Sequence, residues 1–397
     1  MSTSAHSVAS AFSQVALSPE IETALHLMLA PSTEFSARIE GRKTVVASGT
    51  GEGSERLFAM LPNERSPRWL LPLASRDCTR RALEQVRVFA PVARAAKVAL
   101  QFAAAVGALP RITKTLSVSC NSGPGLFDKI AQISETPDAL FAVTFGTVSS
   151  YRKLTVTVMR PDGAVVAFVK VAMTQEASFR IKQEAEMLKT LSLTALSPFV
   201  PRVLFDGQWN GQMALCVSAG PAEASPMHFN AAHRALLEVL WSIRPVARDA
   251  QMLVIEVEEE INRLGTTFDP DSASVISAAI ARARQELKDT NISCGLYHGD
   301  FAPWNLRTAK DALFVFDWEA AAWDRPNLWD IAHFDTQLVT LLGHKSRFRE
   351  TTRGMPSAPG LYLLYLVKTI ADACRESGAC STQVGDRVRL LRNALQN

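Results

Sequence analysis

The sequence lacks the features that mark several large classes of protein. Its 397 residues include only six cysteines, with no C-x-x-C pair and no close His/Cys group, so neither a zinc site nor a disulfide framework is indicated. No uncharged apolar run reaches the length of about eighteen residues that a transmembrane helix needs. A formal net charge of +3 is small for this length and gives no electrostatic case for nucleic-acid binding.

Two further absences bear on location and on nucleotide chemistry. Residues 1–20 contain no Lys or Arg and no long apolar segment, which argues against a secretory signal. Scattered, reduced thiols fit the cytoplasm, so we predict a cytoplasmic protein. No Walker A sequence occurs, so a P-loop nucleotide site is not predicted.

The composition is that of a globular protein longer than one typical domain. Hydrophobic residues make up 47% and charged residues 20%, which supplies ample material for a core. An Asn/Gly/Ser/Pro-rich break at 121–125 falls near the end of a first region. We therefore divide the chain into three regions, 1–133 of unknown role, a strand-rich 134–219 and a mostly helical 220–397.

The middle region has the clearest periodicity. Leu154, Val156 and Val158 alternate with threonines, which is typical of a strand, and the turn residues 161–163 follow. The predicted elements are strands at 142–148, 154–158 and 164–171, a helix at 176–191, and short strands at 203–205 and 213–217. Three strands, a helix and two strands is the order of a small kinase-type nucleotide lobe.

The strongest motif is Y-H-G-D-F-A-P-W-N at 297–305, followed by F-V-F-D-W-E at 314–319. Phosphoryl transfer requires a carboxylate that receives or orients the acceptor proton and hard oxygen ligands for magnesium. Asp300 and Asn305 have the D-x-x-x-x-N spacing of kinase catalytic loops, and Asp317 ends an apolar strand. The spacing alone would be weak, but the ordered run and the second motif together make it specific.

These two runs closely resemble the aminoglycoside phosphotransferase and choline kinase-like family. The resemblance covers roughly 139–332 and does not include the first region. It implies an α+β, bilobal protein-kinase-like fold, with a small β-rich N-lobe at 134–219 and a mostly helical C-lobe at 220–397. An additional N-terminal α/β or mixed region would precede these lobes.

The resemblance also implies roles for single residues. Asp300 matches the family's catalytic base, and Asn305 and Asp317 match its magnesium ligands. His298 resembles the histidine that braces the catalytic loop, and we favour packing over acid–base work for it. Asp330 resembles an aspartate that supports this loop, but a helix cap or a surface carboxylate would explain it equally.

Lys170 lies inside the apolar strand, where an unpaired cation is costly. Glu184 shares the apolar face of the next helix with Ile181 and Leu188, so it is the expected partner. This pair would match the strand-lysine to helix-glutamate pair of kinases, which positions the nucleotide phosphates. The alternative is that Lys170 snorkels to the surface.

The phosphate-covering loop is weakly indicated. Between the first two strands there is a single glycine, Gly146, and we predict that Ser149 and Ser150 supply donors to phosphate. Arg152 would either add charge there or lie in water. The segment 216–221 resembles an inter-lobe hinge, where the backbone of Val217 would meet the adenine.

The predicted function is transfer of the γ-phosphate of ATP, with Mg²⁺, to a hydroxyl of a small molecule such as a sugar, an amino alcohol or an aminoglycoside-like compound. The sequence does not decide between ATP and GTP. Candidates for the acceptor pocket are Trp323, Asp324, His333 and Asp335. The alternatives are a kinase-like scaffold without turnover, or a kinase acting on a glycan or protein.

The first region carries no catalytic motif. Arg80, Arg87 and Arg94 recur every seven residues, near one face if a single helix continues, but Pro91 would break such a helix. A basic amphipathic surface over 92–109 could contact anionic lipid as a peripheral membrane site. The alternative, which we favour, is a helical subdomain packed on the core with its arginines in water.

Overall fold

The computed structural model describes residues 18–28, 35–40, 55–120, 125–264, 268–310, 312–378 and 381–396. The predicted break at 121–125 falls almost wholly outside them, as do residues 1–17. Two compact units make up the chain. The first unit comprises Met1–Gly146, Leu154–Val169 and Trp209–Gln212, and the second comprises Thr147–Lys153, Lys170–Gln208 and Met213–Asn397. No helix in the described ranges is long and apolar enough to span a membrane.

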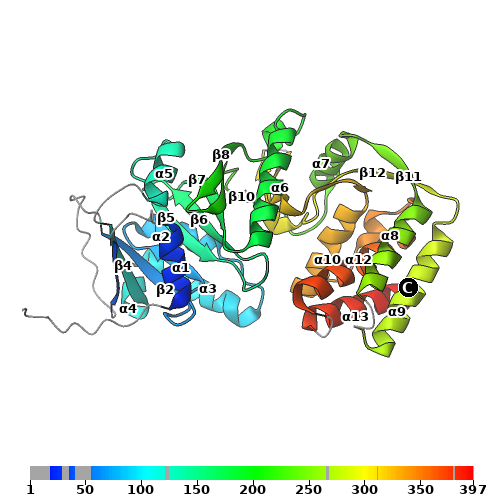
Figure 1. The fold of residues 1–397 in the computed structure, drawn as a ribbon, viewed down its shortest axis with the longest axis horizontal. Coiled ribbons are helices and arrows are strands. Elements are labelled where there is room, and N and C mark those ends of the chain that lie inside the picture. Colours follow the sequence, from blue (N-terminus) through cyan, green and yellow to red (C-terminus); the bar gives the residue numbers. More distant parts are fainter. Residues whose placement is uncertain are drawn as a thin grey trace, which may run out of the picture. The chain divides into compact units, whose positions relative to one another are not determined.

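The first unit is built on a sheet whose strands follow the order β1-β4-β2-β3-β5-β6-β7 (Figure 1). Its elements are α1 (Pro19–Met28), β1 (Phe35–Glu40), β2 (Arg56–Leu61), β3 (Trp69–Pro72), α2 (Arg76–Gln85), α3 (Pro91–Ala105), α4 (Leu109–Ile112), β4 (Lys114–Cys120), α5 (Leu126–Ile133), β5 (Leu140–Phe145) and most of β6 (Lys153–Met159) and β7 (Val165–Ala172). β3 pairs antiparallel with β5, with Trp69 opposite Thr144. The predicted first region and the first strands of the predicted nucleotide lobe therefore share one sheet, and the three-domain division stays a prediction.

Side chains along each strand point alternately to the two faces of this sheet. Helices cover both faces and pack against the apolar side chains there. Ala142 of β5 joins a core with Leu83 of α2 and Ala104 of α3. Phe141, the residue before it, points the other way and stacks on Phe127 of α5 at a ring-centroid distance of 4.4 Å. This buried sheet gives the first unit its own hydrophobic core.

A single helix does not continue through 80–94. α2 ends at Gln85, and Pro91 begins α3 at a position where its missing N–H costs nothing. Lys97 of α3 donates to the carbonyl oxygens of Glu84 (3.0 Å) and Val86 (2.8 Å), so it caps the end of α2. The predicted seven-residue arginine repeat is therefore divided between two helices and the segment that joins them.

The second unit carries the motif segment. Its elements are α6 (Gln175–Leu191), β8 (Val203–Trp209), β9 (Gln212–Ser218), β10 (Glu223–Ala224), α7 (Ala231–Ser242), β11 (Val246–Asp249), α8 (Ala250–Arg263), α9 (Pro270–Glu286), β12 (Asn291–Tyr297), β13 (Leu306–Ala309), β14 (Ala312–Val315), β15 (Ala322–Pro326), α10 (Trp329–Leu342), α11 (Phe348–Thr351), α12 (Ala358–Ser377) and α13 (Thr382–Gln396), with 3₁₀ turns η1 (Ser197–Phe199), η3 (Pro303–Asn305) and η4 (Trp318–Ala320). The apolar helix α12 packs against α8, α9, α10 and α13 (Figure 1). The predicted strands and helix of the middle region are confirmed within a few residues at each end.

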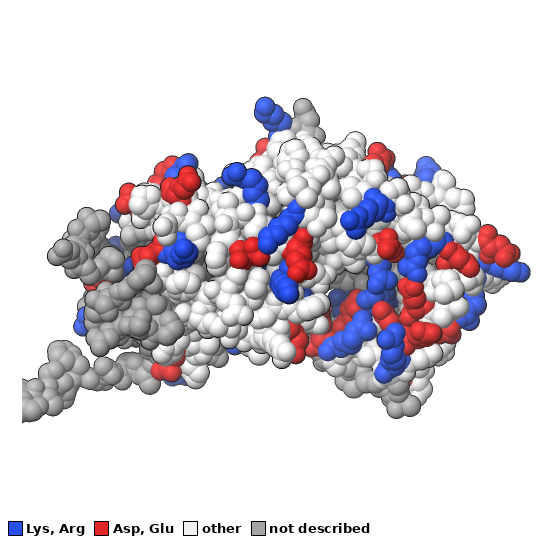
Figure 2. All heavy atoms as spheres, turned by 45° about the horizontal axis from the view of Figure 1, so that its top comes forward, with Lys and Arg blue, Asp and Glu red and all other residues white. Residues whose placement is uncertain are grey.

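Surface charge and thiols agree with the composition. On the face shown in Figure 2, basic and acidic side chains are interspersed. Cys78, Cys216, Cys294 and Cys374 are buried and form no disulfide. The side chains of Cys120 and Cys380 lie outside the described part of the chain.

Candidate active site

The loop that carries the Y-H-G-D-F-A-P-W-N motif follows β12 and is hydrogen-bonded to α10. Asp330, in the first turn of α10, is 1% exposed and accepts from the backbone N–H groups of His298 (3.0 Å) and Gly299 (3.2 Å). Burial raises the pKa of Asp330 to about 7, although these two donors oppose the rise. Of the alternatives left open for Asp330, the structure therefore favours support of the loop.

His298 is fully buried and uses both ring nitrogens on backbone. Its Nε2 lies 2.8 Å from the carbonyl oxygen of Phe316, and its Nδ1 accepts from the N–H of Asp300 at 3.2 Å. Burial lowers the pKa of His298 to about 4, so the ring is neutral near pH 7. The strand before Asp317, β14, ends at Val315, two residues earlier than predicted, and His298 ties the loop to Phe316 in the segment that follows this strand.

Gly299 has φ +86°, in the left-handed region that L side chains rarely adopt. A Cβ added there would lie 2.4 Å from the carbonyl oxygen of Ala320. The loop therefore passes so close to the segment after Asp317 that only glycine fits. The backbone conformation that this glycine allows sets the direction in which the side chain of Asp300 points.

We expect Gly299→Ala to destabilise the protein more than Gly354→Ala does. Gly354 has a similar φ of +84° but nothing within 4 Å of the added Cβ, so it carries the backbone strain without the clash. The difference should be on the order of 1–3 kcal/mol in the free energy of unfolding, the cost of overpacking. Denaturant titration of the two variants measures it, and equal destabilisation would contradict the close approach.

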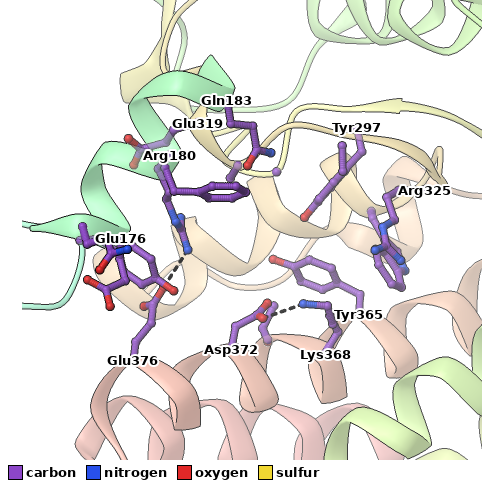
Figure 3. Close-up of a pocket in the computed structure, with 18 residues that line it drawn as sticks. Glu176, Arg180, Gln183, Tyr297, Glu319, Arg325, Tyr365, Lys368, Asp372 and Glu376 are labelled. Carbon is purple, nitrogen blue, oxygen red and sulfur yellow. Dashed lines mark hydrogen bonds and ion pairs between the residues drawn. The ribbon is translucent and has the colours of Figure 1, made fainter. Parts of the chain in front are cut away.

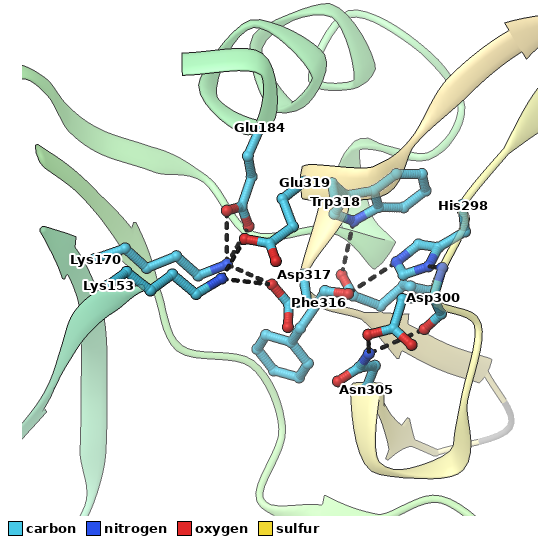
Figure 4. Close-up of polar contacts among 11 residues, drawn as sticks. Lys153, Lys170, Glu184, His298, Asp300, Asn305, Phe316, Asp317, Trp318 and Glu319 are labelled. Atoms are coloured by element: carbon cyan, nitrogen blue, oxygen red, sulfur yellow. Dashed lines mark hydrogen bonds and ion pairs between the residues drawn. The ribbon is translucent and has the colours of Figure 1, made fainter. Parts of the chain in front are cut away.

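Asp300 and Asn305 lie together in the loop (Figure 4). The Asn305 amide donates to the Asp300 carboxylate at 2.7 Å and to the Asp300 carbonyl at 2.9 Å. His333 Nε2 lies 2.9 Å from the other carboxylate oxygen. Burial acts to raise the pKa of Asp300, but the hydrogen bond from His333 opposes it, and the pKa lies below its ordinary value.

The predicted Lys170–Glu184 pair is present and includes Asp317. Lys170 Nζ lies 2.8 and 2.6 Å from the two Glu184 oxygens and 2.6 Å from Asp317 Oδ1. Burial acts to lower the pKa of Lys170, but the two carboxylates outweigh it, so the ammonium stays charged. Lys170 therefore does not snorkel to the surface, since it is only 8% exposed.

Two members of this cluster were missed in the sequence. Lys153, at the start of β6, forms an ion pair with Glu319 and lies 3.8 Å from Asp317 Oδ1 (Figure 4). Glu319 was visible as the second carboxylate of D-W-E, a pattern that could have been weighed as a ligand pair. Lys153 gave no signal, because a lysine at a strand end is usually solvated.

The residues at this site fit a divalent cation. Carboxylate oxygens of Glu184, Asp317 and Glu319 all lie within 4.8 Å of one another. Asn305 Oδ1 is buried and has no hydrogen-bond partner within the described residues. Hard oxygen donors of this kind are those that Mg²⁺ prefers. Asp317 also adopts φ +67°, a conformation that is uncommon outside glycine and that clusters at functional sites.

The residues predicted to meet the nucleotide lie in the loop after β5 and near the end of β9. Ser149 and Ser150 are exposed in the loop between β5 and β6, and Ser149 Oγ accepts from the N–H of Tyr151 at 3.3 Å. Val217 is buried near the end of β9, and a Cβ on Gly220 would lie 2.5 Å from the Phe314 ring. Their contact with phosphate or adenine remains a prediction.

Of the four acceptor-pocket candidates, His333 is hydrogen-bonded to the motif, at Asp300. Trp323 lies under the Arg244 guanidinium, 4.7 Å from ring centroid to Cζ. Asp335 accepts from Ser346 Oγ and the N–H of Arg347, each at 2.6 Å, so it holds the loop after α10. Asp324 is exposed on β15.

A cavity of about 760 Å³ lies within the second unit beside the motif. Gly299 and Glu319 border it, and it carries aromatic rings and charges of both signs (Figure 3). The other lining residues include Arg180, Tyr297, Tyr365, Lys368 and Asp372. Such a lining offers hydrogen-bonding groups, charges and aromatic faces to a bound molecule.

The sequence matches no protein-family model. No curated protein matches it either. The fold matches solved structures. Aminoglycoside phosphotransferase APH(4)-Ia is 12% identical over 68% of this chain and 97% of that one, with a TM-score of 0.51. A thermostable mutant of that enzyme, in ternary complex with AMP-PNP and hygromycin B, is 11% identical over 67% and 96%, with a TM-score of 0.50. The chain therefore has the α+β fold of protein-kinase-like aminoglycoside phosphotransferases, as predicted.

Proposed function

We propose that this protein is an ATP- and Mg²⁺-dependent phosphotransferase that phosphorylates a hydroxyl of a small molecule. The observation that carries the proposal is the joint placement of two groups of side chains. Asp300 and Asn305 form one group, and Lys170, Glu184 and Asp317 form the other. These are the base, metal-ligand and phosphate-binding residue types that phosphoryl transfer requires.

Each residue has a role that its surroundings support. Asp300 is held ionised by its low pKa and accepts the proton of the acceptor hydroxyl. Asn305 and Asp317, joined by Glu319, would hold Mg²⁺, which would supply positive charge to offset the negative charge of the nucleotide phosphates. Lys170, freed in part from Asp317, would bind phosphate oxygens while Glu184 keeps it in place. Ser149, Ser150 and the backbone of Val217 complete the nucleotide site in this proposal.

The acceptor is a small hydroxylated compound, and a sugar, an amino alcohol or an aminoglycoside-like molecule suits the cavity described above. A solved neighbour with this fold holds AMP-PNP and hygromycin B together, which supports a nucleotide donor with a polyhydroxylated acceptor. In this proposal residues 134–219 form the nucleotide lobe and 220–397 the acceptor lobe of a cytoplasmic enzyme.

Release of ADP from Mg·ATP tests the proposed function. The purified chain is incubated with Mg·ATP and a panel of sugars, amino alcohols and aminoglycosides, and ADP and phosphorylated products are measured. We expect at least one acceptor to raise ADP release above the rate with water. Nucleotide binding without ADP release in the presence of any acceptor would favour a kinase-like scaffold without turnover. Phosphate transfer only to a glycan or protein would favour a kinase that acts on such a polymer.

If the enzyme instead acts on a glycan or protein, residues 1–133 would be its docking unit, but deletion of this region tests that role poorly. β3 pairs with β5 and Phe127 stacks on Phe141, so removal of this region would uncover the sheet of the first unit. Loss of activity would then follow from unfolding. Substitutions at exposed side chains of the region are the better test.

From the sequence we favoured a helical subdomain without a lipid contact, but the exposed apolar side chains of α3 change this preference, and we also propose that α3 is a peripheral contact for anionic lipid. Val98, Phe102 and Val106, spaced by four residues on one face, are 65%, 70% and 51% exposed. No Asp or Glu occurs between Glu84 and Asp128, and Arg94 and Arg111 are exposed at the two ends of this segment. Apolar side chains with basic neighbours are typical of helices that lie in a membrane interface.

We expect binding to phosphatidylserine-containing vesicles in a sedimentation assay, and little binding to neutral phosphatidylcholine. Phe102→Asp should lower the partition coefficient about tenfold or more, the cost of not burying one aromatic side chain. Met252→Asp, at a 52% exposed apolar position on α8, is the control and should bind as the native chain does. Equal binding by both variants would exclude α3 as the contact.

A further inference from the structure

A chain of three side chains leads from α12 to the carboxylate of Asp300. Tyr365 Oη lies 2.9 Å from His333 Nδ1, and His333 Nε2 lies 2.9 Å from Asp300 Oδ1. Tyr365 is 1% exposed and His333 is 9% exposed, so both are fixed by packing. Gln337, one turn further along α10, has the end of its side-chain amide 3.1 Å from the same His333 Nε2, and a protonated Nε2 requires the oxygen of this amide to face it.

The hydroxyl of Tyr365 selects the tautomer of His333. A neutral imidazole has one N–H and one lone pair. A phenol that donates to Nδ1 leaves the proton on Nε2, which then points at Asp300. Burial raises the pKa of Tyr365 well above its usual value, so the phenol remains a donor across the working pH range.

The Asp300 carboxylate is therefore held from two sides. Asn305 donates to Oδ2 from η3 at 2.7 Å, and His333 donates to Oδ1 from α10 at 2.9 Å. A carboxylate offers about four lone-pair sites, so two bonds leave room for an acceptor hydroxyl. The Asp300 side chain is 37% exposed, which leaves one side open to that hydroxyl.

Resting on the proposed function, we propose that His333, braced by Tyr365, is a positioning residue that fixes the orientation of the Asp300 carboxylate toward the acceptor hydroxyl. Without it, the carboxylate is held by Asn305 alone and rotates away from the reactive direction. A displacement of about 1 Å at a catalytic group can cost roughly 100-fold in rate. Tyr365 also borders the 760 Å³ cavity, so the brace links the wall of that cavity to the base (Figure 3).

Three substitutions separate positioning from mere packing. His333→Leu keeps the bulk and removes the donor. His333→Gln places an amide N–H near the position of Nε2 and restores the donor. Tyr365→Phe removes only the hydroxyl. ADP release from Mg·ATP is measured for each, with water and with any acceptor that the native chain uses, and thermal unfolding with Mg·ATP shows that the nucleotide still binds.

We expect kcat to fall about 10- to 100-fold in His333→Leu, with the KM for ATP unchanged. Most of the lost activity should return in His333→Gln, and kcat should fall less in Tyr365→Phe. In the His333→Gln background, Tyr365→Phe should have little further effect, because no tautomer remains to be set. Native kcat in His333→Leu, or equal loss in the Leu and Gln variants, would overturn the inference while leaving the proposed function intact.

Failure of the proposed function gives a different result. If the native chain releases no ADP above background with any acceptor, the proposed phosphotransferase is wrong. The inference is then decided by a double-mutant cycle of unfolding free energies with His333→Leu and Asp300→Asn. Coupling between the two sites would support the positioning contact, and strict additivity would overturn it.

Discussion

Asp300→Asn should lower kcat by about 100- to 10,000-fold, the usual contribution of a general base. The substitution keeps the size of the side chain but removes the group that accepts the acceptor proton. Asn305 and His333 both donate to this carboxylate, so an amide at the position would face two donors with one oxygen. Steady-state measurement of ADP release with the best acceptor gives the ratio.

The nucleotide site provides the control for this variant. Lys170 and Asp317 are bonded to each other at 2.6 Å and keep this contact in the variant, so the Kd for Mg·ATP should change by no more than a few-fold. Native kcat in Asp300→Asn would mean that Asp300 is not the general base. Loss of ATP binding as well as turnover would instead indicate that the loop had collapsed.

The pH dependence follows from the same carboxylate. Its pKa lies below the ordinary value of 3.8, and the base acts when ionised, which is the state above the pKa. Activity that depends on Asp300 is therefore retained on acidification until the pH falls below that value. A decline in rate between pH 8 and pH 5 would have to come from another group.

The sequence predicted the site residues best where a charged side chain falls at a position that should be buried. Lys170 in an apolar strand and Glu184 on an apolar helix face each needed a partner, and the structure shows each bonded to the other. The catalytic loop was predicted for a different reason, because Gly299, Asp300 and Asn305 occur in a fixed order whose chemistry is specific. Both arguments depend on residues that few other arrangements would tolerate.

What the sequence could not supply was the placement of residues without such a conflict. His333 was one of four polar candidates on the same stretch, and only the direction of α10 decides that it meets Asp300 while Asp335 meets Ser346. Similarly, the sequence of β3 does not indicate the strand with which it pairs. The pairing of Trp69 with Thr144 follows from the sheet as a whole and not from local periodicity.

Asp317→Asn should abolish the stabilisation of the protein by Mg·ATP. Nucleotide at about a hundred times its Kd stabilises the native chain by roughly 2.7 kcal/mol, which appears as a rise of a few degrees in Tm. The variant removes a negative charge from the side chains that would hold the cation, Asn305, Asp317 and Glu319. Its own fold should persist, because Lys170 keeps its bonds to Glu184 and Lys153 its ion pair with Glu319.

Asp324→Asn is the matched control, since Asp324 has the same left-handed backbone, with φ +58° against +67° at Asp317, but lies on the exposed edge of β15. It should show the full Mg·ATP shift. Replacing Mg²⁺ with EDTA should remove the shift from the native chain and from Asp324→Asn alike, and should change nothing in Asp317→Asn. A shift that survives in Asp317→Asn, or that survives EDTA in the native chain, would mean that nucleotide binds without this carboxylate cluster, and the metal ligands would have to be sought elsewhere.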